Sequence, residues 1–131
     1  MAHVRASIGE TDFAVQIAAR HHSLISDEPA ALGGHDAGPA PYDLLLASLG
    51  SCTAITLRMY AKRKQWTVRS VLVQLRFNRE EQGAHIERLI AIDGDVTAEQ
   101  RARLMEIAEK TPVTLTLKTG TPIRSELRAS L

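Results

Sequence analysis

Cys52 is the one cysteine in this sequence of 131 residues, and this makes it the first candidate for chemistry. It lies in the most apolar stretch of the chain, residues 43–60. A lone thiol excludes an internal disulfide, so the sulfur either packs in the core or reacts. A cysteine buried in apolar surroundings is inert, whereas a reactive one needs a cation or directed N–H donors nearby, because the thiolate is the nucleophile. The residues around Cys52 leave both interpretations open.

Histidine and glycine clusters are weaker candidates for a site. His21-His22 and His35 are potential metal ligands, but no Cys, Asp or Glu cluster with ligand spacing accompanies them. Adjacent histidines in a strand point to opposite faces, which disfavours a shared ion. The glycines of residues 33–38 lack the strand, turn and helix context of a phosphate loop. We therefore expect neither a metal nor another cofactor.

The elements that position these residues follow from hydrophobic periodicity and turn signals. Together they predict an α+β fold in one domain, residues 1–131, with an antiparallel sheet and two helices on one side of it. We expect strands over residues 4–8, 13–17 and 22–25, a loop over 31–41, a helix over 41–65, a hairpin over 71–77 and 85–92, a second helix from Thr97 to its end at Pro112, and a last strand over 123–127.

The helix that carries Cys52 is apolar on nearly all sides. At about 100° per residue, the side chains of Leu45, Leu49, Thr56 and Met59 fall within about 60° of Cys52. The opposite side holds mostly small residues, so another backbone could approach it closely. Such a helix is expected to be central in the fold rather than a surface cover.

The overall composition limits the class of protein and its partners. Hydrophobic residues make up 44% and charged residues 24%, as in soluble globular proteins, and the net charge of +1 favours neither nucleic acid nor an anionic membrane as a partner. The longest apolar run, Leu44 to Leu57, spans about 14 residues and is too short and too polar for a membrane span. No secretory signal is visible. We therefore expect a cytoplasmic protein.

One long segment carries a family resemblance. Residues 33–61, GGHDAGPAPYDLLLASLGSCTAITLRMYA, resemble the OsmC/Ohr family, most closely an OsmC-like branch with Asp-Glu-Pro, Gly-Gly and Gly-Pro-x-Pro ahead of the cysteine helix. Asp27-Glu-Pro29 matches that pattern too. The resemblance implies an α+β protomer that forms an intertwined homodimer. It also implies two long helices buried between sheets, and active sites at the subunit interface.

The same resemblance implies a function for Cys52. It falls on the position of the cysteine that attacks the peroxide in the family's thiol-dependent peroxidases, which reduce organic hydroperoxides. Attack by the thiolate would give a sulfenic acid at Cys52 and an alcohol. Two other interpretations stay open: a non-catalytic homodimer that binds a small apolar or thiol-reactive ligand, and a structural dimer in which Cys52 only packs.

Two departures from the family pattern concern the residues that activate and recycle the thiol. The family's second cysteine commonly lies in a Lys-Cys-Pro-Val-His pattern, where this chain has Lys110-Thr-Pro-Val-Thr114, so turnover would need an external thiol reductant. The glutamate ten residues before the family's reactive cysteine falls on Tyr42. For the activating arginine, Arg20 is the first candidate and Arg5 the second. The expected site therefore consists of Cys52 and Arg20, with a lining of Tyr42, Leu45, Leu49, Met59 and His22.

Overall fold

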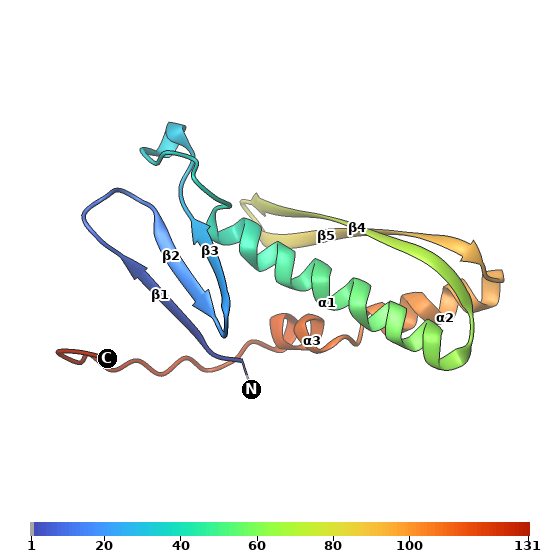
Figure 1. Cartoon of the computed structure of the whole chain (residues 1–131). Coiled ribbons are helices and arrows are strands. Elements are labelled where there is room, and N and C mark those ends of the chain that lie inside the picture. The colour runs from blue at the N-terminus through green and yellow to red at the C-terminus, as the bar shows by residue number, and fades with distance from the viewer. Residues whose placement is uncertain (1) are drawn as a thin grey trace. The chain divides into compact units, whose positions relative to one another are not determined.

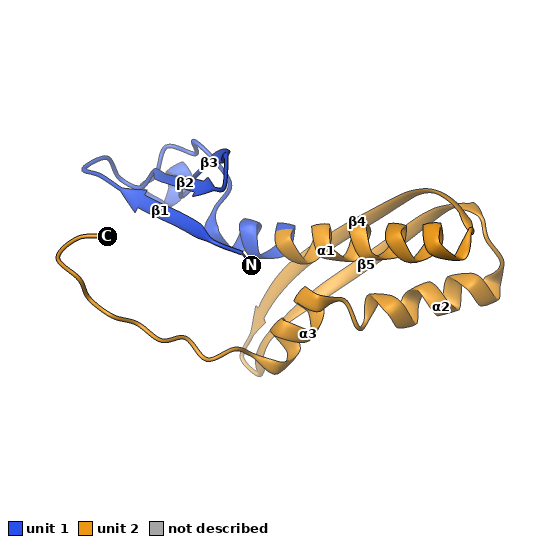
Figure 2. Cartoon of the chain, turned by 60° about the horizontal axis from the view of Figure 1, so that its bottom comes forward, with its two compact units in different colours: residues 1–47 blue, residues 48–131 orange. Residues whose placement is uncertain are grey.

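The structure is a computed structural model that describes residues 2–131. The chain forms two compact units, residues 1–47 and residues 48–131, which are called unit 1 and unit 2 here (Figure 2). The long helix α1, Pro41–Lys64, begins in unit 1 and continues through the first part of unit 2.

Unit 1 contains a three-stranded antiparallel sheet in the order β1-β2-β3. The strands are β1 Val4–Ile8, β2 Val15–Ala19 and β3 His22–Ser26, so the expectation of three short strands is confirmed. Ala19 pairs with His22, which leaves a two-residue turn of Arg20 and His21. Arg20 adopts a φ of 56°, in the left-handed region used by tight hairpin turns. A short 3₁₀ turn, η1 Ala30–Leu32, follows the sheet.

The segment after β3 is organised by the buried carboxylate of Asp27. The backbone N–H groups of Glu28, His35 and Ala37 donate to it at 2.8, 3.1 and 3.1 Å, and that of Phe13 donates at 3.3 Å. Burial raises the pKa of the Asp27 carboxyl, but the four N–H donors together lower it more, and the net pKa lies below its ordinary value. The Asp-Glu-Pro sequence thus has a structural explanation, because its aspartate closes the loop that leads to α1.

We expect the stability of this loop to depend on pH. Because the pKa of Asp27 is lowered by folding, its stabilisation is complete above the ordinary value of about 3.9 and is lost as pH falls through the lower folded value. Urea unfolding measured across acid pH should show this loss. The variant Asp27→Asn should be less stable at neutral pH and should lose less stability on acidification. If it and the wild type lose stability in parallel, the carboxylate does not have this role.

Helix α1 begins and ends with local signals. Pro41 is its first residue, and the Asp43 carboxylate accepts a hydrogen bond from the N–H of Ala40 at 2.9 Å, which satisfies a donor that the helix leaves free. At the other end Gln65 adopts a φ of 58°. The N–H groups of Gln65 and Trp66 donate to the carbonyls of Lys62 and Ala61, which is a Schellman motif.

Gln65 occupies a backbone conformation that glycine adopts more readily. We expect Gln65→Gly to raise the free energy of unfolding by about 0.5–1 kcal/mol, because the penalty for a side chain in the left-handed region disappears. Lys64→Gly is the matched control, since Lys64 lies within the helix, and this change should cost about 1 kcal/mol. Denaturant unfolding measures both. Equal destabilisation by the two changes would contradict the explanation.

Unit 2 packs helices on one face of a long hairpin (Figure 1). Strands β4 Thr67–Glu80 and β5 Gly83–Asp95 pair antiparallel, and α2 Ala98–Ala108 and α3 Pro112–Thr119 follow. The Thr97 and Gln100 capping box at the start of α2 is confirmed, with both hydrogen bonds at 3.0 Å. The buried core is made of Leu57, Tyr60, Ala61, Val68, Leu104 and Ala108. It joins α1, the hairpin and α2, so the prediction of helices on one side of a sheet holds within unit 2.

Two expectations for the end of the chain are wrong. Pro112 does not simply end the second helix, because after a break it becomes the first residue of α3, with Thr111 as N-cap. Residues 123–127 form no strand, and Ile123 and Leu127 are 90% and 99% exposed. Their alternation is that of a strand, but a strand needs a hydrogen-bonded neighbour, and in the described part of this chain none lies beside them.

Helix α1 is more open than its composition suggests. With 24 residues and an 18-residue window of mean hydropathy 1.3, it is long and apolar enough to cross a membrane by those criteria alone, which the core helices of soluble proteins also meet, so the length of the shorter apolar run does not by itself exclude a span. Only 28% of that window is buried. The expectation of a central helix is therefore not met within a single chain, although Leu57 and Ala61 contribute to the core.

Candidate thiol site

Cys52 lies on the border between the buried and exposed faces of α1. Leu49 and Thr53, on one side of it, are buried, whereas Ser51 and Ile55, on the other side, are exposed. Cys52 itself is half-buried. A thiol in this place is supported by the core from behind and remains open to a small molecule.

The predicted lining residues on α1 differ in exposure. In unit 2, Leu49 is buried, whereas Met59 is 66% exposed. Tyr42 is exposed and Leu45 half-buried, on the first turns of the helix in unit 1. Their helical spacing places all four side chains on the same side of the helix as Cys52.

Arg20 and His22 lie together in unit 1, where Arg20 is in the β2–β3 turn and His22 is the first residue of β3. Both side chains are exposed, as is that of Arg5 in β1. The expectation that His21 and His22 point apart is wrong: their ring centroids are 4.0 Å apart, because His21 lies in the turn and not in a strand. The roles of Arg20 and His22 toward the thiol remain predictions.

Met59 also borders a pocket of about 400 Å³ in unit 2. Its lining is Thr56, Met59, Tyr60, Arg63, Arg103 and Ile107, so neither Cys52 nor the other predicted residues belong to it. Arg103 Nε donates to the Tyr60 hydroxyl oxygen at 3.1 Å, and this hydrogen bond, with nearby positive charge, lowers the pKa of Tyr60 although burial opposes it. Among the described residues, no group of three or more His, Cys, Asp and Glu side chains could hold a metal ion.

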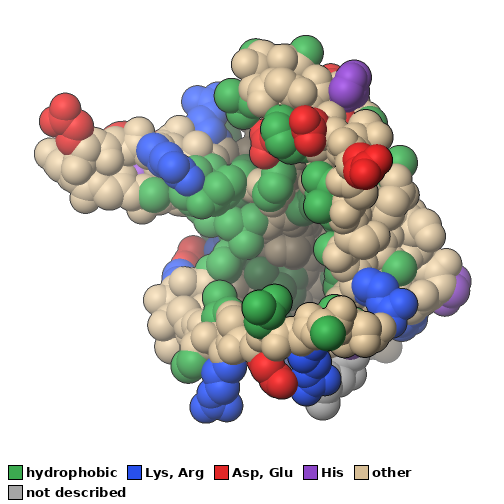
Figure 3. All heavy atoms as spheres, turned by 90° about the vertical axis from the view of Figure 1, so that its left-hand side faces the viewer, with side chains coloured by type: hydrophobic (Ala, Val, Ile, Leu, Met, Phe, Trp, Pro, Cys, Tyr) green, Lys and Arg blue, Asp and Glu red, His purple; other side chains and the backbone are tan. Residues whose placement is uncertain are grey.

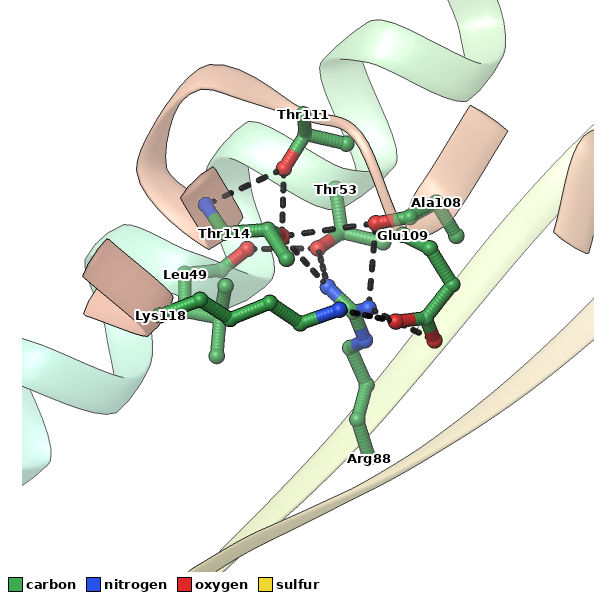
Figure 4. A network of polar contacts seen from close by, with 8 residues as sticks. All are labelled: Leu49, Thr53, Arg88, Ala108, Glu109, Thr111, Thr114 and Lys118. Atoms are coloured by element: carbon green, nitrogen blue, oxygen red, sulfur yellow. Dashed lines mark hydrogen bonds and ion pairs between the residues drawn. The ribbon is translucent and has the colours of Figure 1, made fainter. Parts of the chain in front are cut away.

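A polar network that no sequence pattern predicts surrounds Arg88, next to the turn of α1 that carries Cys52 (Figure 4). The Arg88 side chain is 11% exposed. Its Nη1 donates to the hydroxyls of Thr53 and Thr114, both at 2.9 Å, and its Nη2 donates to the carbonyl oxygen of Ala108 at 3.0 Å. One guanidinium thus links α1, the end of α2 and the start of α3.

The network continues to the position where the resemblance places a second cysteine. Thr111 is buried there, and its hydroxyl oxygen lies 2.6 Å from that of Thr114. On the solvent side, a Glu109 carboxylate oxygen lies 3.5 Å from Arg88 Nη2 and the other is paired with Lys118. The hydrogen bond from Lys118 is the main cause that lowers the pKa of Glu109, with burial opposing it. This chain thus has polar threonines, Thr111 and Thr114, at the two positions where the family pattern has Cys and His.

Comparisons with known proteins agree on the fold. An OsmC like protein from Mycoplasma pneumoniae superposes with a TM-score of 0.78 at 18% identity, over 92% of this chain and 89% of that one. An organic hydroperoxide resistance protein from Elizabethkingia anophelis gives a TM-score of 0.66 at 18% identity, over 92% and 89% of the two chains. One named OsmC from Legionella pneumophila gives 0.63 at 17% identity, over 90% and 89%.

These identities are low, so the structural likenesses show a shared fold alone. A search of curated proteins gave no match. The family assignment comes from residues 34–126, which match the family model described as OsmC-like protein. The match covers more than half of the chain and includes the cysteine helix, the hairpin and both later helices. The chain therefore belongs to the family of OsmC-like proteins.

Proposed function

We propose that this protein, as a single OsmC-like domain, is a one-cysteine, thiol-dependent peroxidase that reduces organic hydroperoxides through Cys52. The observation that carries the proposal is the position of Cys52. It is the one thiol of the chain, half-buried at the border of an apolar helix, in a family member whose structural neighbours include proteins named for organic hydroperoxide resistance.

The proposed reaction begins at the Cys52 sulfur. The thiolate attacks the distal oxygen of the hydroperoxide, the O–O bond breaks, and the alkoxide takes a proton to leave as an alcohol. Cys52 is then a sulfenic acid. A first external thiol displaces water to form a mixed disulfide, and a second releases the reduced Cys52 together with the external disulfide. Thr111 supports the need for an external reductant, because it offers no second thiol within the chain.

The remaining roles in this proposal are those that the sequence suggested. Arg20 would supply the cation that favours the thiolate. The lining of Tyr42, Leu45, Leu49, Met59 and His22 would favour an organic over a small polar peroxide, because most of it is apolar. The cytoplasm is the proposed compartment, since thiols are kept reduced there.

We also propose a homodimer as the functional form. Two observations on unit 2 support it: the apolar Ile55 and Met59 are exposed beside Cys52, and the tail exposes Ile123 and Leu127. Hydrophobic side chains, green in Figure 3, also lie at the surface on the face drawn there. The tail residues 123–129 alternate between an apolar or small face and a charged face, the pattern of a half-buried strand. A second copy could cover the helix and supply the sheet edge that the tail lacks.

The decisive experiment follows Cys52 chemically. Reduced protein is treated with cumene hydroperoxide, the sulfenic acid is trapped with a dimedone-type probe, and peroxide consumption is followed with monothiol and dithiol reductants. We expect trapping at Cys52 and consumption that Cys52→Ser reduces at least 100-fold, to the background rate. No trapping, together with equal consumption by Cys52→Ser, would rule out the peroxidase.

The second candidate function is a homodimer that binds a small apolar or thiol-reactive ligand without turnover. It is favoured by the two departures from the family pattern, Tyr42 and Thr111, at the positions of the glutamate and the second cysteine. The same experiment separates the two functions. Covalent or saturable binding at Cys52 without continued peroxide consumption would support the binding protein.

A further inference from the structure

Arg88 occupies a position where the strand pattern calls for an apolar residue. On β5 the side chains of Glu87 and Leu89 are exposed, whereas Ile86, Arg88 and Ile90 point inward. Withdrawing a guanidinium from water costs free energy unless its N–H groups are satisfied. Its hydrogen-bond acceptors are the Thr53 hydroxyl on α1, the Ala108 carbonyl oxygen at the end of α2 and the Thr114 hydroxyl on α3. A charged side chain is thus buried at a cost in free energy beside Thr53, the residue that follows Cys52. This placement points to a role for Arg88 beyond filling space.

Thr53 is the connection between Arg88 and the thiol-bearing turn. Its hydroxyl donates to the carbonyl oxygen of Leu49 at 2.7 Å and accepts from Arg88 Nη1 at 2.9 Å. A threonine that bonds back to the fourth preceding residue slightly weakens a helix, so the arrangement needs a compensating contact, which Arg88 provides. With both hydrogen bonds made, the Thr53 side chain is fixed. Cys52 is the next residue on the same turn.

On the other face of this turn, Ser51 and Ile55 are exposed. Attack on an O–O bond needs the sulfur in line and about 3–3.5 Å from the oxygen, and a misplacement of about 1 Å can cost 100-fold in rate. Contacts on the buried side of the helix therefore bear directly on the direction of the Cys52 side chain. Thr53 and Arg88 form the polar contact on that side.

We propose that Arg88 is a positioning residue for Cys52: through the Thr53 hydroxyl it fixes the turn of α1 that presents the thiol. Its hydrogen bonds to Ala108 and Thr114 hold the α2–α3 corner to the same turn. None of these hydrogen bonds involves the Cys52 sulfur, so they are unchanged when Cys52 is oxidised. A sulfenic acid would keep its place and stay open to an external thiol. The effect on the peroxide reaction rests on the proposed function of Cys52, whereas the restraint of the turn by Arg88 does not.

Three variants separate positioning from general stability. Arg88→Lys keeps the charge but lacks the planar fork that reaches several acceptors at once. Thr53→Val keeps the shape and removes the hydrogen bond from Arg88 to α1, together with the hydrogen bond from Thr53 to the Leu49 carbonyl. Glu109→Gln is the matched control, because it weakens the outer ion pair of Arg88 and leaves the Thr53 link intact.

Two measurements are made on each variant. Hydrogen–deuterium exchange reports the restraint of the turn from Leu49 to Thr53 without any reaction. The rate constants of Cys52 with cumene hydroperoxide and with iodoacetamide report its chemistry. We expect Arg88→Lys and Thr53→Val to speed exchange in this turn and to slow the hydroperoxide reaction about tenfold, with the iodoacetamide rate within about twofold. Glu109→Gln should match the wild type in both.

Each outcome decides one of the two ideas. If Thr53→Val exchanges and reacts as the wild type does, or if both reagents slow in parallel with thermal stability, Arg88 is not a positioning residue. If the wild type does not react with the hydroperoxide at all, the proposed peroxidase fails. In that case the exchange data still show whether Arg88 restrains the turn.

Discussion

Replacing Thr111 by cysteine should convert the one-cysteine protein into one that closes an internal disulfide with Cys52 on exposure to hydroperoxide. The family resemblance places a second cysteine at this position. In the structure, Thr111 is buried, and its hydrogen bond to Thr114 leads through Arg88 to Thr53, the neighbour of Cys52. A sulfenic acid at Cys52 would then be captured within the chain.

The measurement is a thiol titration and an intact mass after treatment with peroxide. After peroxide treatment, the titration of Thr111→Cys should find no free thiol, and its mass should fall by that of two hydrogens. A dithiol should restore both thiols. The loss of the N-cap hydroxyl of α3 should cost about 1 kcal/mol of stability. Thr116→Cys is the control, because it adds an exposed cysteine to the same helix without entering the network. A sulfenic acid that persists in Thr111→Cys would mean that this corner does not face the sulfur.

Charging the open face of α1 should separate the proposed dimer into monomers. In the double variant Ile55→Glu, Met59→Glu, two carboxylates replace apolar side chains that are 52% and 66% exposed in the single chain. If a second copy covers them, burying the charges without partners costs several kcal/mol, and a change of about 4 kcal/mol weakens association about 1000-fold. Sedimentation equilibrium or light scattering measures the result.

The matched control lies on the other side of unit 2. Leu72 and Leu89 are 66% and 67% exposed on the outer face of the β4–β5 hairpin, and the same change to glutamate there should leave the oligomeric state unchanged. A dimer that survives the α1 variant but dissociates in the hairpin variant would move the interface to the hairpin. A monomeric wild type would contradict the proposed dimer directly.

The parts of the fold that the sequence predicted are those with local causes. The bounds of α1 follow from Pro41 at its start and from the change to β-rich composition after Gln65. The capping box of α2 and the alternation of the β4–β5 hairpin are equally local. For α3 the signal is present, because a threonine followed by proline is a typical helix start, but the same Pro112 also marks the end of the preceding helical pattern.

Other features depend on partners distant in the sequence. Arg88 follows the alternation of β5 as any residue would, and its acceptors on α1, at Ala108 and on α3 lie far away along the chain. The tail shows the opposite error, since its alternation predicted a strand that has no neighbour in the described chain. Periodicity indicates which face a residue occupies, but not whether another strand or an acceptor will be there.

The glycine-rich segment that precedes α1 has a consequence for how such segments are interpreted. A Cβ atom at Gly34 would lie 2.0 Å from the carbonyl oxygen of Glu28, and one at Gly38 would lie 2.0 Å from that of Ile25. Glycine is required there because neighbouring backbone leaves no space for a side chain. A composition rich in glycine and proline, usually taken as a mark of a flexible linker, here accompanies a tightly packed segment. Insertions or fusion junctions in it would therefore disturb the protein more than its composition suggests.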